Sequence, residues 1–301
     1  DAQNQGSHFY FEDHSSKLTY DKSKLVGLSL INGKFDSGGQ SQGRGASVTV
    51  RHGHSLTFEK ILFKDNSMWD NGETHSSGAV RVEPGSRFYY CRFENNRSEG
   101  GNNSHSTGAI GIGGDGNQYS DVNVLIEGCE FINNQGRNEG GAINARHNTV
   151  IQNSVFYKNK VERGSGEGQG GAIATNPQRN GTGGWTYDTF THIINCTFVE
   201  NSAASIGGAI WQYGFKGPVV FNSIFMNNKW NNHTDMNDFA GGGGENTKMI
   251  VNNVRVDEST LAGDWNVQWG SNIYHDPPAF TDTTKEDFTL TSASTLIGAG
   301  T

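Results

Sequence analysis

The sequence is poor in the residues that build a thick globular core. Only 33% of its 301 residues are hydrophobic, and it contains five prolines and three cysteines. No apolar run approaches the roughly 20 residues that a helix needs to span a bilayer, so we expect no membrane insertion. A composition of this kind is typical of a disordered chain unless an internal repeat supplies order.

The balance of charge also excludes some partners. The formal net charge is −8 at pH 7, whereas a nucleic-acid or anionic-membrane partner calls for a basic face. No signal peptide precedes Asp1. We expect that an export signal has been removed and that the protein is extracellular or located at the cell surface.

Glycine is abundant, with 42 residues, and some of these glycines belong to a repeated motif. A Gly-Ala step followed by an aliphatic residue starts at Gly78, Gly108, Gly141, Gly171 and Gly208. A second motif, Phe-x-x-Asn, starts at Phe63, Phe93, Phe131, Phe156, Phe198 and Phe225. Each copy holds two short stretches of alternating apolar and polar residues, separated by Gly and Asn turns, which indicates strands.

The repeat predicts an all-β, single-domain, right-handed parallel β-helix, the pectate-lyase-like solenoid. Successive repeat phenylalanines lie 30, 38, 25, 42 and 27 residues apart, mostly within the range typical of solenoids. We expect these side chains to form an inward column with a spacing of about 4.8 Å. The repeat asparagines should occupy the following turn, adopt left-handed dihedrals and hydrogen-bond the neighbouring coil.

The cysteines fit the same repeat. Cys91, Cys129 and Cys196 all lie two residues before a repeat phenylalanine. We expect them to be buried thiols, because parallel stacked Cβ vectors give poor disulfide geometry.

Three segments follow from the repeat. Residues 1–44 are predicted to form an N-terminal cap with a first irregular coil, residues 45–275 the β-helix coils, and residues 276–301 a C-terminal cap. Long loops are expected to begin at Ser67, Arg97 and Lys229, directly after Phe-x-x-Asn corners.

A candidate binding strip lies on the outward positions of the Gly-Ala strands. If the aliphatic residues point inward, two columns of side chains point outward. The columns consist of Arg81, Gly111, Asn144, Ala174 and Trp211, and of Glu83, Gly113, Arg146, Asn176 and Tyr213. We predict that Arg81, Glu83, Asn144, Asn176 and Trp211 bind polysaccharide, because guanidinium and amide groups bond hydroxyls and acidic groups and aromatic rings stack on sugars. A polar sheet face with no specific ligand explains the same columns.

The paired motifs resemble the repeats of chlamydial-type polymorphic outer-membrane proteins, which are surface adhesins and autotransported passenger domains. The tail, Asp276 to Phe280, Asp287 to Leu290 and Ser294 to Gly300, resembles the end of bacterial β-helix surface proteins of the choice-of-anchor type. Together the resemblance covers roughly residues 45 to 301. It implies an adhesin-like surface protein, although the same scaffold also carries polysaccharide lyases and hydrolases.

A lyase acting on an acidic glycan is the alternative function. Lyases with this fold commonly abstract a proton next to a carboxylate, which gives Arg146 or His147 the role of base, Arg81 that of neutralising the acid and Tyr213 that of acid. A hydrolase needs two facing carboxylates, and Glu83, Glu99 and Asp115 are candidates.

Other possibilities stay open. Asp235 and Asp238, with Asn237 between them, form an oxygen-rich loop that suits Ca²⁺, although a solvated loop explains it as well. No other cofactor is indicated. The expected partner is a polysaccharide or cell-surface glycan, and a structural module that self-associates is the third interpretation.

Overall fold

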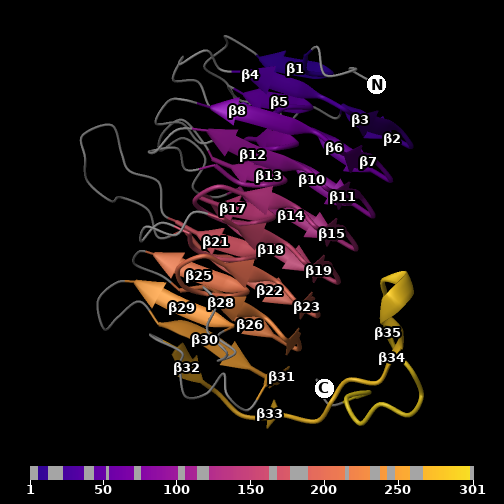
Figure 1. Ribbon diagram of the computed structural model, residues 1–301, viewed down its shortest axis with the longest axis vertical. Coiled ribbons are helices and arrows are strands. Elements are labelled where there is room, and N and C mark those ends of the chain that lie inside the picture. The colour runs from indigo at the N-terminus through magenta and orange to yellow at the C-terminus, as the bar shows by residue number, and fades with distance from the viewer. Residues whose placement is uncertain are drawn as a thin grey trace.

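The computed structural model describes residues 6–12, 23–36, 44–51, 54–70, 76–100, 106–113, 122–162, 168–176, 189–213, 217–230, 238–242, 248–257 and 267–298. In these segments the chain winds into a right-handed parallel β-helix, and its strands stack along the long axis of the molecule (Figure 1). Four parallel sheets run along that axis, and each coil as far as Trp230 contributes one strand to each sheet in turn, whereas the coils after it contribute to fewer sheets.

The first two sheets carry the Gly-Ala strands and the strands that follow them. Sheet A contains β1 (Phe9–Glu12), β5 (Val48–Arg51), β9 (Val80–Val82), β13 (Ile110–Ile112), β17 (Ile143–Ala145), β21 (Ile173–Thr175), β25 (Ile210–Tyr213) and β29 (Phe239–Gly242). Sheet B contains β2 (Lys24–Val26), β6 (Thr57–Glu59), β10 (Arg87–Tyr89), β14 (Val124–Glu127), β18 (Thr149–Gln152), β22 (Thr191–Ile194), β26 (Val219–Phe221), β30 (Met249–Asn252) and β32 (Val267–Trp269).

The other two sheets carry the Phe strands and the strands after the repeat asparagines. Sheet C contains β3 (Ser29–Ile31), β7 (Leu62–Lys64), β11 (Arg92–Glu94), β15 (Glu130–Ile132), β19 (Val155–Tyr157), β23 (Thr197–Val199), β27 (Ile224–Met226), β31 (Val254–Arg255) and β33 (Ile273–Tyr274). Sheet D contains β4 (Lys34–Asp36), β8 (Ser67–Asp70), β12 (Arg97–Gly100), β16 (Gln135–Gly136), β20 (Lys160–Val161), β24 (Ser202–Ala203) and β28 (Lys229–Trp230).

Two expectations about the coil need correction. Each coil has four strands, not the two alternating stretches that the repeat indicates. The positions predicted to open long loops, Ser67, Arg97 and Lys229, instead begin strands of sheet D. These strands are short, and apolar and polar residues hardly alternate in them, so the sequence pattern of their polar residues indicates loops.

The predicted phenylalanine column is confirmed. Neighbouring rings from Phe63 to Phe225 lie 4.6–4.8 Å apart, and their planes differ by 2–9°. All of these side chains are fully buried. The parallel register sets the spacing, because equivalent residues of adjacent strands pair directly, as Phe93 does with Phe63 and Phe131.

The repeat asparagines form a continuous ladder between sheets C and D. We call Asn66, Asn96, Asn134, Asn159, Asn201 and Asn228 the Asn ladder. In each step the side-chain Nδ2 donates to Oδ1 of the next ladder asparagine at 2.8–3.0 Å. The same Nδ2 also donates to a main-chain carbonyl, such as that of Phe93 for Asn134, at 2.9 Å. Both amide hydrogens and the amide oxygen are therefore used in a site that excludes water.

The left-handed dihedrals fall one residue earlier than predicted. The residues directly before the ladder asparagines have φ between 51° and 57°, whereas the ladder asparagines do not have positive φ; these residues are Asp65, Asn95, Asn133, Lys158, Glu200 and Asn227. The turn residue therefore faces solvent and differs from coil to coil. The residue after it is an inward-pointing asparagine in each of these coils.

Close approach of neighbouring coils explains the glycine before each alanine. A Cβ added at Gly141 would overlap the carbonyl oxygen of Gly171 and lie 2.6 Å from the backbone nitrogen of Lys160. Gly78, Gly108 and Gly171 are hemmed in by backbone in the same way. The glycine of the Gly-Ala motif is therefore required because the backbones of neighbouring coils are in contact there.

The cysteines are buried free thiols, as predicted. They lie at the turn between sheets B and C, where the equivalent place in other coils is taken by Ile61, Ser154 and Ser223. The backbone N–H of Cys91 donates to Sγ of Cys129 at 3.4 Å, and that of Cys129 donates to Oγ of Ser154 at 3.1 Å. Burial raises the pKa of the Cys196 thiol to about 12.

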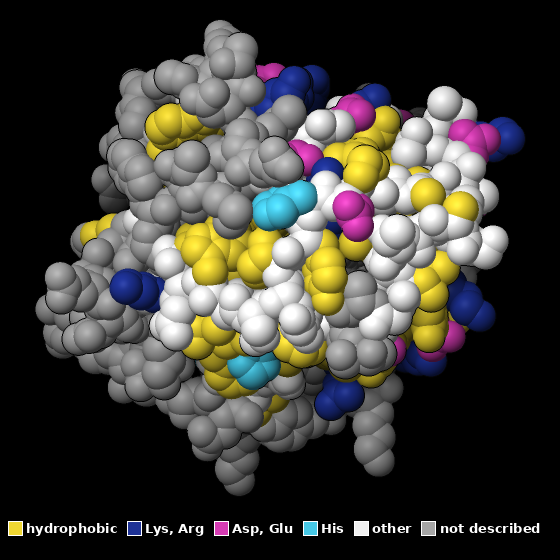
Figure 2. All heavy atoms as spheres, turned by 90° about the horizontal axis from the view of Figure 1, so that it is seen from below, with side chains coloured by type: hydrophobic (Ala, Val, Ile, Leu, Met, Phe, Trp, Pro, Cys, Tyr) yellow, Lys and Arg dark blue, Asp and Glu magenta, His cyan; other side chains and the backbone are white. Residues whose placement is uncertain are grey.

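The terminal segments differ in their roles. The described part of residues 1–44 supplies β1 to β4, one strand for each sheet. At the other end, Val267, Trp269 and Ile273 are half-buried against the core. Seen from that end, apolar side chains lie between polar groups across the surface (Figure 2).

The segment predicted as a C-terminal cap runs back along the side of the solenoid (Figure 1). Its hairpin, which we call the strap, consists of β34 (Phe280–Asp282), the 3-10 turn η2 (Thr283–Lys285) and β35 (Asp287–Leu290). Phe288 packs on the outer face of sheet C against Ile132, Tyr157 and Val199. Glu286 forms an ion pair with Arg92 at 2.6 Å.

We predict that Asn134→Ala destabilises the protein by about 3 kcal/mol, because it leaves the buried donors of Asn96 without an acceptor and removes two further hydrogen bonds. Urea unfolding followed by circular dichroism measures the change. Asn133→Gly is the matched control, since it keeps the left-handed turn and removes one exposed hydrogen bond. Equal losses for the two variants would contradict a structural role for the ladder.

We also predict that Gly141→Ala lowers the melting temperature strongly, because the added methyl meets rigid backbone. Gly27→Ala offers a contrast, since nothing lies within 4 Å of a Cβ there and only its φ of 66° opposes the change. Differential scanning calorimetry compares the two. A smaller effect at Gly141 than at Gly27 would show that the coils are not held at this separation.

Candidate functional site

The predicted strip lies on the outer side of sheet A, but most of it is buried. The exposed fraction is 7% for Arg81 and Arg146 and 5% for Trp211. Glu83, Asn144, Asn176 and His147 are also buried. Only Tyr213, at 42%, is exposed among the strip residues singled out from the sequence. The expectation of an exposed strip is therefore wrong, since alternation identifies the outer side of a strand and not its solvent access.

Arg81 extends along the solenoid into the next coil. Gly111 and Gly113 provide the room, because a Cβ at Gly113 would meet the Arg81 guanidinium and one at Gly111 would lie 3.5 Å from its Cδ. Gly113 occupies the place that Arg146 has one coil further on, since Ile112 pairs with Ala145. The guanidinium of Arg81 thus lies one coil from Arg146, closer than the two coils between their backbones.

Asn144 and Trp211 each bring an unsatisfied polar atom to the strip. The Asn144 amide donates from Nδ2 to Glu139 Oε2 at 2.8 Å, and its Oδ1 has no hydrogen-bond partner among the described residues. The indole Nε1 of Trp211 also has none. Trp211 stacks on Tyr213 with ring centroids 5.8 Å apart, and it packs with Ala174 and Ala240.

His147 is held as a neutral ring. Burial lowers its pKa to about 4, against a smaller opposing effect of a hydrogen bond to the carbonyl of Val122. Its Nδ1 accepts a hydrogen bond from the backbone N–H of Asn148 at 2.9 Å. The lone pair that a general base needs is therefore already occupied, so the geometry does not favour His147 as the base of a lyase.

The predicted calcium loop has a different role where the structure describes it. Asp235 and Asn237 lie outside the described residues. Asp238 is fully buried, and its Oδ1 accepts from Nδ2 of Asn228, the last member of the Asn ladder, at 2.7 Å. Within the described segments no group of three or more His, Cys, Asp or Glu side chains is arranged to hold a metal ion.

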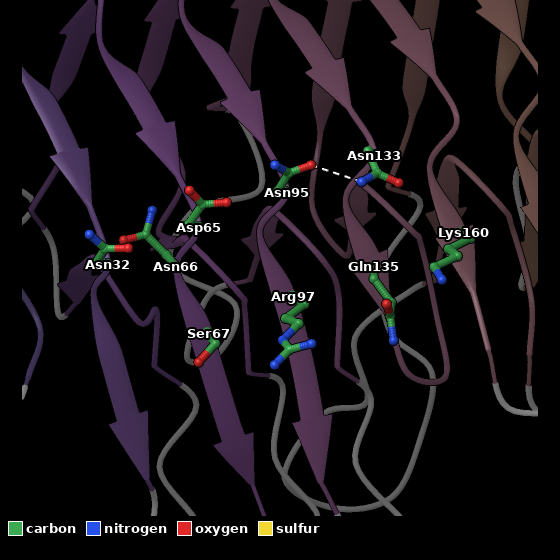
Figure 3. Close-up of a pocket in the computed structure, with 9 residues that line it drawn as sticks. All are labelled: Asn32, Asp65, Asn66, Ser67, Asn95, Arg97, Asn133, Gln135 and Lys160. Atoms are coloured by element: carbon green, nitrogen blue, oxygen red, sulfur yellow. Dashed lines mark hydrogen bonds between the residues drawn. The ribbon is translucent and has the colours of Figure 1, made fainter. Parts of the chain in front are cut away.

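The accessible polar surface lies at the turn between sheets C and D. A groove of about 410 Å³, which we call the turn groove, crosses five successive coils (Figure 3). It is lined by Asn32, Asp65, Asn66, Ser67, Asn95, Arg97, Asn133, Gln135 and Lys160. Apart from the ladder asparagine Asn66, these residues occupy the left-handed turn position or the first position of a sheet D strand.

The turn groove repeats the same polar chemistry from coil to coil. Asn133 donates from Nδ2 to Oδ1 of Asn95 at 2.8 Å, so exposed amides also stack (Figure 3). Arg97 pairs with Glu99 at 2.9 Å, and its side chain stays 55% exposed. Lys160 pairs with Glu162 at 2.7 Å and stays 40% exposed. Amide, guanidinium and ammonium groups therefore face solvent in one row.

Sequence reasoning missed this groove, although a signal exists. The residues directly before and directly after each ladder asparagine, such as Asn95 and Arg97, stand at fixed offsets from the repeat phenylalanine. The strip was favoured because its strands are more regular. The groove residues belong to turns and to short strands whose sequence pattern is typical of loops.

Comparison with known proteins identifies the repeat. Residues 195–212 match the Chlamydia polymorphic membrane protein repeat. This stretch contains both motifs, Phe198 with Asn201 and Gly208-Ala209-Ile210, and runs from the start of sheet C through sheet D into sheet A. The chain is a β-helix repeat protein that resembles the polymorphic membrane proteins.

The match covers a short stretch of the chain, and the family from which the repeat comes consists of surface proteins of the outer membrane. A search of curated protein sequences returned no significant match. Among the described residues, no helix has the length and apolarity that a membrane crossing demands.

The buried ring of His147 predicts a loss of stability in acid. Its folded-state pKa is about 4 and its ordinary value 6.5, so the unfolded chain binds the proton first as the pH falls. We expect a cost on the order of 3 kcal/mol between pH 6.5 and pH 4. Melting temperatures of the native protein and His147→Gln at pH 7 and pH 4.5 measure it. The variant should lose less stability between these two pH values, and an equal or larger loss would contradict the assignment.

Proposed function

We propose that the protein is a cell-surface, adhesin-like β-helix that binds polysaccharide along the turn groove. The observation that carries the proposal is the row of solvent-facing amide, guanidinium and ammonium groups repeated at the spacing of the coils. With a rise of about 4.8 Å per coil, five coils extend the row over roughly 19 Å. A polymer with regularly spaced hydroxyl groups matches a surface with regularly spaced donors and acceptors.

Rigidity favours binding at this place. Apart from Asn32 and Asn66, each groove residue directly precedes or follows a ladder asparagine. The ladder is buried and fully hydrogen-bonded, so little ordering of the backbone remains to be done on binding. Planar amide and guanidinium groups also give directional bonds to hydroxyls and carboxylates. The groove replaces the strip as the proposed surface because its side chains are accessible.

We predict that Arg97→Ala combined with Gln135→Ala weakens retention on a bound polysaccharide about 5- to 150-fold, because two sets of hydrogen bonds are lost at about 0.5–1.5 kcal/mol each. Affinity gel electrophoresis against a panel of acidic and neutral polysaccharides measures retention. Arg87→Ala on sheet B is the matched control and should behave like the native protein.

The same incubations test for chemistry. Ultraviolet absorbance from unsaturated products and the appearance of new reducing ends are both followed, with and without Ca²⁺. A binding protein should show retention without either signal. Unsaturated product would contradict a binding-only function, and retention that is unchanged in the double variant would contradict the groove.

A further inference from the structure

We propose that a hollow beneath the strap is a second sugar-binding subsite, and that it accepts a neutral, hydroxyl-rich sugar residue. This inference rests on the proposed polysaccharide-binding function and adds a location and a ligand class to it. The hollow has a volume of about 550 Å³. We call it the strap pocket, and it is lined by Glu94, Asn95, Ile132, Asn133, Tyr157, Lys158, Thr283, Thr284 and Glu286.

The strap pocket lies between the turn of the strap and the outer face of sheet C, and contacts on the C-terminal side of that turn hold the strap in place. Phe288 anchors one part, with its ring 4.9 Å from that of Tyr157. Glu286 anchors the other through Arg92. The turn residues Thr283 and Thr284 form one wall, and sheet C with its following turn forms the other.

The strap pocket and the turn groove are neighbours. Asn95 and Asn133 line both, and their side chains hydrogen-bond to each other at the boundary. A polysaccharide lying in the groove therefore has a lateral opening beside it at these two coils. A side branch or a chain end can enter the strap pocket without leaving the groove.

The lining favours hydroxyl donors. Glu94 and Glu286 supply carboxylate oxygens, and the turn threonines supply hydroxyl groups. Burial alone would raise the pKa of Glu94, but hydrogen bonds from Lys64 and Arg92 hold it below its usual value, so this carboxylate stays ionised at neutral pH. An ionised carboxylate is a strong acceptor for a sugar hydroxyl.

The charge around the strap pocket disfavours an acidic sugar. The cations are already bound: Arg92 contacts Glu94, Glu130 and Glu286, while Lys64 contacts Glu94. Lys158 lies over the ring of Tyr157 at 4.7 Å and faces Glu200 at 3.7 Å. Four carboxylates thus face three cations, and a further carboxylate from a uronate would add repulsion.

The test uses the complete chain and neutral trisaccharides built from glucose, galactose or N-acetylglucosamine, with trigalacturonate as the acidic probe. Isothermal titration calorimetry measures binding to the native protein, to Thr283→Trp and to Lys285→Trp. The indole at position 283 should obstruct the strap pocket, whereas Lys285 is 81% exposed and lies outside the lining. Both positions are exposed, so both variants should melt near the native temperature.

We expect at least one neutral trisaccharide to bind the native protein and Lys285→Trp alike, and to bind Thr283→Trp at least tenfold more weakly. Trigalacturonate should bind at least tenfold more weakly than that neutral probe. Equal binding to both tryptophan variants, tighter binding of trigalacturonate, or no binding of any neutral probe would overturn the inference.

The double variant in the turn groove distinguishes a failure of the strap pocket from a failure of the proposed polysaccharide-binding function. Arg97→Ala with Gln135→Ala should reduce retention on polysaccharide and leave the neutral trisaccharide affinity unchanged. If polysaccharide retention persists in the native protein while no trisaccharide binds, the strap pocket fails and the proposed function stands. If the double variant retains polysaccharide fully, the groove fails on its own.

Discussion

The buried hydrogen bonds of the Asn ladder are the constraint on which the rest of the fold depends. A narrow solenoid has little apolar core to offset the cost of ordering its turns, and here every ladder amide satisfies its own hydrogen-bonding groups and those of the next coil. The ladder fixes where each coil turns from sheet C into sheet D. Each repeat phenylalanine lies three residues before a ladder asparagine, so the phenylalanine rings stack at the same spacing as the ladder.

Surface chemistry follows from this arrangement. Since the turn residue before each ladder asparagine needs only a left-handed conformation, its side chain is free to vary, as Asp65, Asn95 and Lys158 show. The inward residue is uniform, and the outward neighbours carry the chemistry of the turn groove. A rigid scaffold with variable exposed positions is the usual basis of a binding surface.

The sequence predicted the parts of the fold that depend on local spacing. The phenylalanine column, the buried thiols and the parallel stacking all follow from fixed offsets between Phe, Cys and Asn. It did not predict sheet D or the position of the strap, because the strands of sheet D are short and polar and because the strap is held by tertiary contacts such as Phe288 on Tyr157. Arg81, Asn144 and Trp211 lie on strands of sheet A, and the burial of their side chains depends on packing that no periodicity encodes.

The Asn ladder also has a polarity. Every step donates in the same sense, from Asn66 toward Asn228, so the amide dipoles of six side chains point head to tail along the axis and add up as peptide dipoles do in a helix. The donor end of this array meets the buried carboxylate of Asp238. The hydrogen-bond acceptor Oδ1 of Asp238 therefore lies at the positive end of the dipole row, where an acceptor is electrostatically favoured. Coils added or removed within the solenoid therefore change the strength of the field that Asp238 experiences.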